Sequence, residues 1–245
     1  MGNYEKVNSK WLLKTRKWLL RGRFLRGRGW LYKPSFEKHV KSRLREVKGD
    51  VFWDIGAHMG FYSLMMRRNF GRVVAVEPNP ETAATLRERT RAAGNIEVLE
   101  IALSNINGSV PLYTQKEKFS IPGIYNKFQN DSLLAKSVHK SARDPSTDRV
   151  VENRPSIQVS QRRFDEMSAG PVDLVKIDVE GAEFLVLDGM RDSLKDGLVK
   201  RIMLELHNRE DKTKLESLFA AYGYAIEWVD PDHLFASVRQ TVHQA

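Results

Sequence analysis

One stretch constrains the fold more than any other: Val51–Leu64, with the sequence VFWDIGAHMGFYSL. It begins with a continuous apolar and β-favouring run, Val51–Trp53, which is typical of a strand buried on both faces. Asp54 follows at the carboxyl end, and Gly56 and Gly60 bracket a turn before a helix. Glycine lets the backbone adopt positive φ or approach a ligand closely, and a helix that begins here directs unpaired N–H groups toward that ligand. The stretch therefore predicts a strand–turn–helix unit with a nucleotide-type pocket.

The spacing of this turn separates two classes of nucleotide. The dinucleotide fingerprint G-x-G-x-x-G needs its second glycine to admit a pyrophosphate. Counted from Gly56, the second and third glycine positions are occupied by His58 and Phe61. Asp54 would repel a pyrophosphate, whereas a carboxylate at this point can hold an ammonium group. S-adenosylmethionine (SAM) carries an α-amino group and a sulfonium cation but no phosphate, so the turn favours SAM.

A second acidic residue supports the same ligand. The apolar run Val73–Val76 predicts a second strand, which ends at Glu77. A carboxylate at the end of the second strand is well placed to accept hydrogen bonds from both ribose hydroxyls. The alternative for both motifs is an ordinary strand–turn–helix unit with capped helix ends and no ligand.

Strands and helices alternate over most of the chain, whose 245 residues suffice for one α/β domain with additions. The pattern predicts helices at about 35–48, 60–69, 81–93, 183–194 and 211–222. Buried strands are expected at 51–53, 73–76, 96–101, 172–177 and 201–204, followed by an antiparallel edge pair at 224–229 and 234–238. Strand–helix repeats of this kind predict a parallel sheet with right-handed crossovers.

Basic residues are concentrated at the N-terminus. Residues 1–33 contain ten Lys and Arg but one acid, so this leader accounts for the whole formal charge of +9, and residues 34–245 are formally neutral. Apolar clusters at Trp11, Trp18 and Phe24 recur at about helical spacing, and none exceeds three residues. This pattern predicts neither a transmembrane span nor a signal peptide. We expect residues 10–32 either to lie on an anionic membrane surface or bind an acidic polymer, or to cover the edge of the domain.

The regular pattern is interrupted between residues 104 and 156. This segment is polar and broken by Gly and Pro, and it predicts an insertion with a hairpin near Ser109–Tyr113 and a partly ordered lid. The chain has no cysteine, which excludes disulfides and thiolate metal sites. A cytoplasmic location, at most peripheral to a membrane, is the expectation.

The order of the motifs resembles the FkbM-type SAM-dependent methyltransferases. The motifs cover about residues 50–225 and are DIGAHMGFYS, AVEPNP, EIALS, NDSLL, RFDEM, DLVKIDVEGAEFLVLDGM and MLELH. The resemblance implies the class I (Rossmann-like) methyltransferase fold, an α/β fold with a seven-stranded, mostly parallel sheet and helices on both faces. It also implies transfer of a methyl group from SAM to a hydroxyl, often on a sugar or a glycosylated natural product.

The resemblance also assigns cofactor-binding residues. Glu77 is expected at the ribose and Asn79 beside the adenosine, while Ala102 and Ser104 match the position that contacts adenine. His58 stands where such proteins often carry Asn. The residues expected around the methionine moiety are Asp54, Gly56, Ala57, His58 and Gly60.

Four polar side chains are candidates for the chemistry. A sugar hydroxyl is a weak nucleophile, so its proton must be removed or its oxygen polarised by a metal ion as it attacks. Asp178, Glu180, Glu205 and His207 are expected at or just past the carboxyl ends of central strands. In one mechanism His207 or Asp178 is the general base and Glu205 orients it. In the other, Asp178, Glu205 and His207 bind a divalent cation such as Mg²⁺.

Each of these side chains also has a structural interpretation. Glu180 and Glu183 would cap the following helix, and Glu205 would pair with Lys176 or an arginine. His207 would then be a histidine that is satisfied at a strand end.

Three functions compete at this level. The first is an O-methyltransferase that acts on a small-molecule or glycan acceptor. The second is an RNA methyltransferase that uses the leader to bind phosphates, although the neutral charge of the domain argues against nucleic acid as a partner. The third is a SAM-binding protein without turnover. Binding alone would not require acids and a histidine beside the methyl group, which argues against this function. The sequence does not indicate the oligomeric state.

Overall fold

The computed structural model describes residues 37–114 and 156–239, which belong to one compact unit, Glu37–Ala245. The predictions made for the basic leader 1–33 lie outside the described residues. The central part of the predicted insertion, residues 115–155, lies outside them as well.

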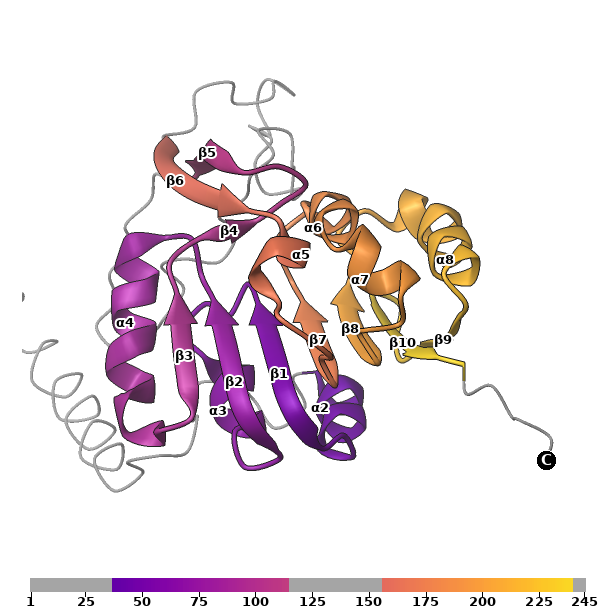
Figure 1. Cartoon of the computed structure of the whole chain (residues 1–245), viewed down its shortest axis with the longest axis horizontal. Coiled ribbons are helices and arrows are strands. Elements are labelled where there is room, and N and C mark those ends of the chain that lie inside the picture. The colour runs from indigo at the N-terminus through magenta and orange to yellow at the C-terminus, as the bar shows by residue number, and fades with distance from the viewer. Residues whose placement is uncertain (1–36, 115–155, 240–245) are drawn as a thin grey trace, which may run out of the picture. The chain divides into compact units, whose positions relative to one another are not determined.

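A seven-stranded sheet forms the centre of the described domain (Figure 1). Its order is β3-β2-β1-β7-β8-β10-β9; the first five strands are parallel, and β10 is antiparallel to both β8 and β9. The expected seven-stranded, mostly parallel sheet with an antiparallel edge pair is confirmed. The strands are β1 (Gly49–Ile55), β2 (Phe70–Val76), β3 (Ile96–Leu99), β7 (Leu174–Ile177), β8 (Arg201–Glu205), β9 (Tyr224–Trp228) and β10 (His233–Val238).

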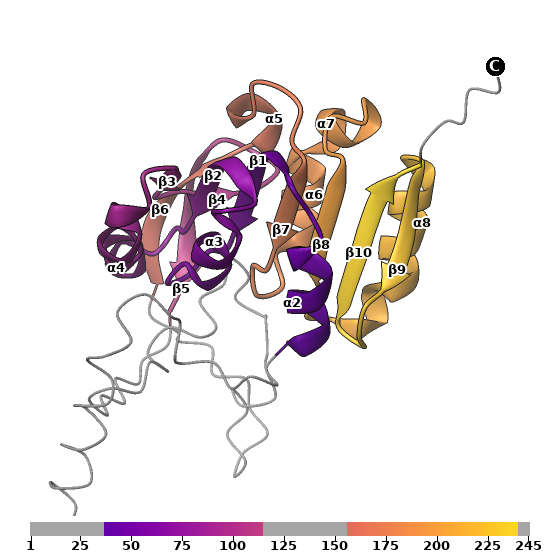
Figure 2. The ribbon, with the colours of Figure 1, turned by 90° about the horizontal axis from the view of Figure 1, so that it is seen from below.

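Helices cover both faces of this sheet (Figure 2). One face packs against α2 (Lys38–Arg45), α3 (Phe61–Met66) and α4 (Pro80–Thr90). The other packs against α5 (Phe164–Met167), α6 (Glu183–Gly189), α7 (Arg191–Lys195) and α8 (Lys212–Ala221). Short 3₁₀ turns, η2 (Arg91–Ala93) and η4 (Arg209–Asp211), follow α4 and precede α8.

Neighbouring residues of β1 show how the two layers are built. Phe52 packs on the α2–α3 side, 5.4 Å from the ring of Phe70, whereas Trp53 packs on the other side, 5.0 Å from the ring of Phe164. Alternation of this kind is the expected geometry of a strand that is buried on both faces. The pairing of β1 with β2 on one side and β7 on the other places Asp54 inside the sheet, near the carboxyl ends of the parallel strands.

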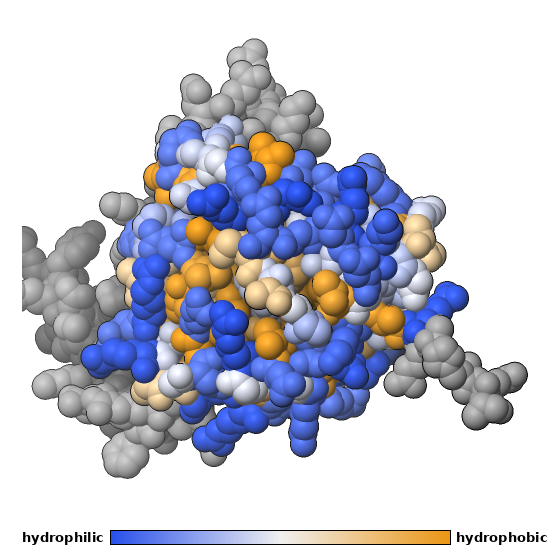
Figure 3. Space-filling model, in the orientation of Figure 1, coloured by the Kyte–Doolittle hydropathy of each residue, from blue (hydrophilic) through white to orange (hydrophobic). Residues whose placement is uncertain are grey.

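The outer surface of the described domain is mainly hydrophilic on the face seen in Figure 3, with apolar patches near its middle. Among the described residues, the large apolar side chains that are well exposed are Ile106, Ile157 and Leu198. Within the same residues, every helix falls short of the length and apolar character that a membrane span requires.

A second, three-stranded sheet contains the edges of the predicted insertion. Its order is β4-β6-β5, formed by β4 (Ala102–Leu103), β5 (Gly108–Tyr113) and β6 (Ser156–Arg162). An antiparallel strand, β5, lies where a hairpin near Ser109–Tyr113 was predicted, and its partner is β6, on the far side of residues 115–155. The predicted third strand likewise ends at Leu99, since the next strand, β4, joins this second sheet.

Two predicted helices are shorter than expected. The helix predicted at 60–69 ends at Met66. The helix predicted to continue to about 194 is broken near Met190 into α6 and α7. Asp165 accepts hydrogen bonds from the Asp192 and Ser193 backbone N–H groups, which favours the start of a new helix at this point. The backbone at Gly189 lies against the Ser104 carbonyl, where a Cβ atom would be only 2.0 Å away.

Candidate active site and cofactor site

The turn after β1 is shaped by its neighbours in the sheet. Gly56 has φ +78°, and a Cβ atom at this position would lie 1.7 Å from the carbonyl oxygen of Asp178. The backbone N–H groups of Gly56 and Ala57 both donate to the Val76 carbonyl, at 3.0 and 2.9 Å. Glycine is therefore required because the ends of β1 and β7 meet here, a constraint that acts in addition to any ligand.

Asp54 is a buried carboxylate with one unsatisfied oxygen. Ser63 Oγ donates to Oδ2 at 2.6 Å, whereas Oδ1 is buried and has no hydrogen-bond partner among the described residues. Burial raises the pKa of Asp54, although nearby Lys176 and the Ser63 hydrogen bond oppose the shift. A buried acceptor without a donor is costly, so this oxygen fits a cationic donor such as the ammonium group of SAM.

Glu77 follows β2 and is held by backbone groups. Its Oε2 accepts from the His58 N–H at 3.0 Å, and its Oε1 accepts from the Asn79 N–H at 2.9 Å. Each carboxylate oxygen can accept a further hydrogen bond, which leaves capacity for ribose hydroxyls. Asn79 caps α4, because its Oδ1 accepts from the backbone N–H groups of Glu81 and Thr82.

The other residues predicted at the cofactor occupy the same loops. His58 has φ +49°, and burial lowers its pKa to about 4, so its ring is neutral at pH 7. Gly60 has φ +78° and stands at the N-cap of α3, where a Cβ atom would lie 2.5 Å from Leu86 Cδ1. Ala102 packs with Leu112 in the core of the small sheet, and Ser104 is buried beside it. The adenine contact assigned to these last two residues stays a prediction.

The four predicted catalytic side chains lie together. Asp178 follows β7, Glu180 stands in the next turn with φ +52°, Glu205 ends β8, and His207 lies two residues further on. From His207 Nε2, the nearest oxygens of Glu180, Glu205 and Asp178 are 3.3, 3.8 and 3.9 Å away. We call Asp178, Glu180, Glu205 and His207 the strand-end cluster.

Glu183 orients the histidine of this cluster. Its Oε1 lies 2.7 Å from His207 Nδ1 and also accepts from the Gly181 N–H at 2.8 Å. Burial by itself lowers the pKa of His207, but Glu183 together with nearby Asp178 and Glu180 outweighs it and raises the pKa to about 9. The sequence suggests Glu205 as the orienting residue and only a capping role for Glu183; in the structure the contact at Nδ1 belongs to Glu183.

The sequence suggests Lys176 as an ion-pair partner for Glu205. In the structure Lys176 forms its ion pair with Asp178 instead. Its Nζ donates to Asp178 Oδ2 at 2.9 Å and lies 4.8 Å from the centre of the Tyr62 ring. Burial alone would lower the pKa of Lys176, but Asp178 and Asp54 raise it above its ordinary value. The pKa of Asp178 is lowered in turn, because Lys176 and His207 outweigh its burial. A lysine inside the apolar strand LVKI is a signal for such a pair, because a buried charge needs a partner.

Sequence reasoning missed two further residues at this edge. His233 faces Glu205 across the β8–β10 pair, with Nε2 3.3 Å from Glu205 Oε2 and Nδ1 2.8 Å from Asp230 Oδ1. Burial lowers the pKa of His233, but Glu205 and Asp230 outweigh it and raise the pKa to about 9. Glu37 precedes α2, and burial raises its pKa to about 7. His233 can be assigned to this site only from the register of β10 against β8, which pairs it with Glu205. No sequence pattern indicates that Glu37 belongs to the site.

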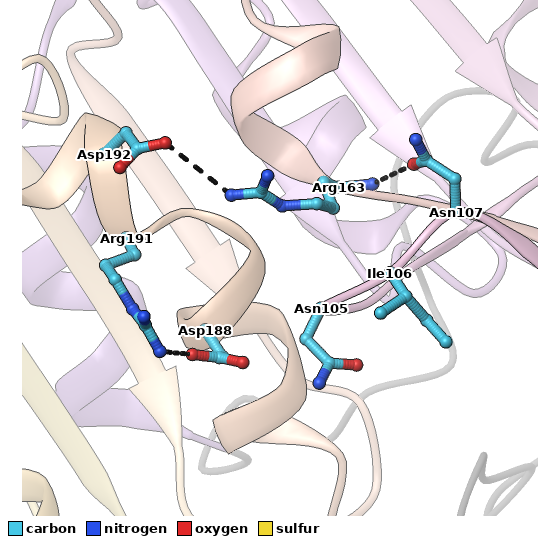
Figure 4. A pocket seen from close by; sticks show the side chains of 7 residues that line it. All are labelled: Asn105, Ile106, Asn107, Arg163, Asp188, Arg191 and Asp192. Atoms are coloured by element: carbon cyan, nitrogen blue, oxygen red, sulfur yellow. Dashed lines mark hydrogen bonds and ion pairs between the residues drawn. The ribbon is translucent and has the colours of Figure 1, made fainter.

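An open pocket of about 470 Å³ lies between the β4–β5 loop and α6–α7, and its lining residue Asn105 accepts a hydrogen bond from Ser104 (Figure 4). Ion pairs join Arg191 to Asp188 and Arg163 to Asp192 along its wall. None of the predicted site residues lines it. Its lining residues are Asn105, Ile106, Asn107, Arg163, Asp188, Arg191 and Asp192.

The chain is similar to known methyltransferases. The profile of the methyltransferase FkbM domain matches residues 54–243. The hexuronic acid methyltransferase AglP of Haloferax volcanii is 30% identical over 176 residues, which cover 69% of this chain and 62% of that protein. The 2-O-methyltransferase NoeI of Sinorhizobium fredii is 26% identical over 157 residues, which cover 62% of this chain and 61% of that protein. The match therefore spans less than two thirds of either relative.

A solved structure supports the fold. The crystal structure of a methyltransferase FkbM from Methylobacillus flagellatus KT superimposes with a TM-score of 0.51 at 15% identity, over 80% of this chain and 50% of that chain. At this identity the likeness bears on the architecture, which is the class I methyltransferase fold.

Proposed function

Because the chain belongs to the FkbM methyltransferase domain family, we propose that it is a SAM-dependent O-methyltransferase. We infer that its acceptor is a hydroxyl of a sugar, a glycan or a glycosylated metabolite. The names of two relatives, a hexuronic acid methyltransferase and a 2-O-methyltransferase, support a sugar acceptor. The formally neutral charge of residues 34–245 argues against RNA.

The observation that carries the cofactor assignment is the pair of acids at the ends of β1 and β2. Asp54 Oδ1 is a buried acceptor that lacks a donor among the described residues, and the ammonium group of SAM would supply one. Glu77 is anchored by two backbone N–H groups and would accept the ribose hydroxyls. Gly56, Ala57, His58 and Gly60 would line the methionine moiety, Asn79 would lie beside the adenosine, and Ala102 and Ser104 at the adenine.

The chemistry is proposed at the strand-end cluster. SAM supplies an activated methyl group, so the protein has mainly to align the acceptor hydroxyl and exclude water. Either His207, oriented by Glu183, takes the hydroxyl proton after losing its own, which a pKa of about 9 makes easier at alkaline pH, or a divalent cation such as Mg²⁺ held by Asp178, Glu205 and His207 polarises the oxygen. Asp178 is already ion-paired with Lys176 and has a lowered pKa, which makes it a weak base.

The basic leader, residues 1–33, bears on where the protein acts and what it contacts. We propose that the protein is cytoplasmic and that residues 10–32 provide a peripheral contact with membranes that carry the acceptor. Flotation of the full-length chain with anionic liposomes tests this. A chain that stays at the bottom of the gradient would end the membrane hypothesis.

Transfer of labelled methyl from SAM into a lysate, fractionated into glycan, lipid, RNA and protein, tests the function. We expect label in the glycan or glycolipid fraction, its loss in Asp178→Asn, and no loss in Asp196→Asn, a matched change at an exposed residue of the same chain. Label in RNA that disappears on deletion of residues 1–33 would instead establish an RNA methyltransferase. SAM binding by calorimetry without label in any fraction would point to a binding protein.

A further inference from the structure

Glu205 lies between two imidazoles. Its Oε1 is 3.8 Å from His207 Nε2, and its Oε2 is 3.3 Å from His233 Nε2. His207 lies just past β8, and His233 begins β10 directly opposite Glu205 in the antiparallel register. The sheet itself therefore places one ring on each side of this carboxylate.

Both rings are held in the same way. His207 Nδ1 lies 2.7 Å from Glu183 Oε1, and His233 Nδ1 lies 2.8 Å from Asp230 Oδ1. A carboxylate on one ring nitrogen, with the other nitrogen directed at further acids, is the arrangement typical of histidine metal ligands. The two Nε2 atoms are therefore oriented toward Glu205 before any ligand binds.

Each side of Glu205 offers a group of three side chains that could act as metal ligands. On one side are Asp178 and His207, and on the other are Glu37 and His233; within each group, Glu205 included, the ligand atoms lie within 4.8 Å of one another. Ligands at about 2.1 Å from one ion are separated from each other by about 3 to 4 Å. Both groups are thus close to the size that a metal ion needs.

A second observation comes from a buried atom that lacks a hydrogen bond. Among the described residues, Glu37 Oε2 is buried without a hydrogen bond, whereas His233 Nε2 is buried with Glu205 Oε2 3.3 Å away. The His233 side chain is only 8% exposed. Buried polar atoms are normally satisfied, so the unsatisfied Glu37 oxygen in this group of ligands points to a missing ligand.

We propose that these residues form a centre for two divalent cations that share Glu205, one held with Asp178 and His207 and the other with Glu37 and His233. Each group combines one imidazole with two carboxylates, which suits Mn²⁺ better than Mg²⁺, because Mg²⁺ prefers oxygen ligands alone. The role of the centre rests on the proposed function: two ions side by side would bind two neighbouring hydroxyls, which predicts a vicinal diol as the acceptor.

Titration of the tag-free, full-length chain with Mn²⁺ after EDTA treatment, followed by electron paramagnetic resonance, tests the centre. We expect two bound Mn²⁺ per chain in the wild type. His207→Gln and His233→Gln should each retain one ion, and Glu205→Gln should weaken both at least tenfold. His39→Gln removes an exposed histidine of α2 and should still bind two.

The outcomes separate the centre from the proposed function. One ion or none in the wild type, or two ions in His233→Gln, would overturn the shared centre. Circular dichroism checks folding, and Asp178→Asn gives a second test of the His207 side if His207→Gln does not fold. SAM binding and methyl transfer are measured on the same samples. Transfer that persists in EDTA would refute the role of the ions and leave the methyltransferase assignment standing.

Discussion

Gly56→Ala should be among the most damaging small substitutions in the domain. At φ +78° an alanine is forced into a left-handed backbone, and its Cβ atom would also lie 1.7 Å from the Asp178 carbonyl oxygen. The obstacle is backbone of the neighbouring central strand end, so it cannot rotate away as a side chain could. The ends of β1 and β7 must separate, and Asp54 and Asp178 must move with them.

The cost has two parts that can be measured separately. A non-glycine residue in the left-handed region costs about 1–2 kcal/mol. Overpacking of a filled site adds about 1–3 kcal/mol. Gly223 provides the control, because it has φ +79° and no atom lies within 4 Å of the point that an added Cβ would occupy. Gly223→Ala should therefore lose about 1–2 kcal/mol of unfolding free energy, and Gly56→Ala about 2–5 kcal/mol.

Urea denaturation of the three proteins, followed by circular dichroism, measures these costs. The informative quantity is the difference in unfolding free energy between Gly56→Ala and Gly223→Ala, compared where the two have the same dependence on urea concentration. This difference isolates the cost of the close approach between the ends of β1 and β7. Calorimetry should also show weaker SAM binding in Gly56→Ala and unchanged binding in Gly223→Ala. Equal unfolding free energies for the two variants would refute the argument from close approach.

Three further changes test individual side chains. Asp54→Asn removes the acceptor proposed for the SAM ammonium group, and we expect calorimetry to show about 10- to 150-fold weaker binding, since a hydrogen bond to a charged group contributes about 1.5–3 kcal/mol. Asp173→Asn should lower the free energy of unfolding by about 1–3 kcal/mol at pH 7. Burial alone would raise the pKa of Asp173, but hydrogen bonds from Lys200 and from backbone N–H groups outweigh burial and lower the pKa. Its contribution is therefore present at pH 7 and is lost as the pH falls below the unfolded value of about 3.9, so urea denaturation should show the gap between wild type and variant closing at acid pH. Tyr224→Phe should cost about 1–3 kcal/mol, because the hydroxyl donates to the buried Val199 carbonyl.

Controls for these three changes lie nearby in the chain. Asp50→Asn alters an exposed acid on the same strand as Asp54 and should leave SAM affinity unchanged. Tyr222→Phe should be milder than Tyr224→Phe, since Tyr222 is only partly buried. A gap between wild type and Asp173→Asn that stays constant down to pH 3 would contradict the assignment of a lowered pKa.

The central sheet could be predicted because its signals are local. Apolar runs marked β1, β2 and β8, and β7 is apolar apart from Lys176, while glycine or proline marked several of the element ends. Parallel strands bring their carboxyl ends to one edge, so the acids that follow each run were expected together. The strand-end cluster was found by this argument alone.

Other features depend on contacts between distant segments. The pairing of β5 with β6 joins strands on either side of residues 115–155, and local periodicity carries no information about such a partner. The contact of Glu183 with His207 could be predicted only from the conformation of the turn after β7. This turn contains two residues with positive φ, Glu180 and Gly181. Sequence patterns name the residue types at a site, but the register of the sheet decides which of them meet.

The balance of charge at this edge favours a cationic ligand over a purely structural network. Among the described residues, Glu37, Asp178, Glu180, Glu183, Glu205 and Asp230 meet Lys176, His207 and His233. Even with both histidines charged and Glu37 neutral, the acids exceed the cations, and the side chains of the other five are 3–27% exposed. Carboxylates withdrawn from water are stable only when they are paired. A network that served stability alone would gain from replacing the surplus acids with neutral residues, so their presence is better explained by cations that arrive with the cofactor or as metal ions.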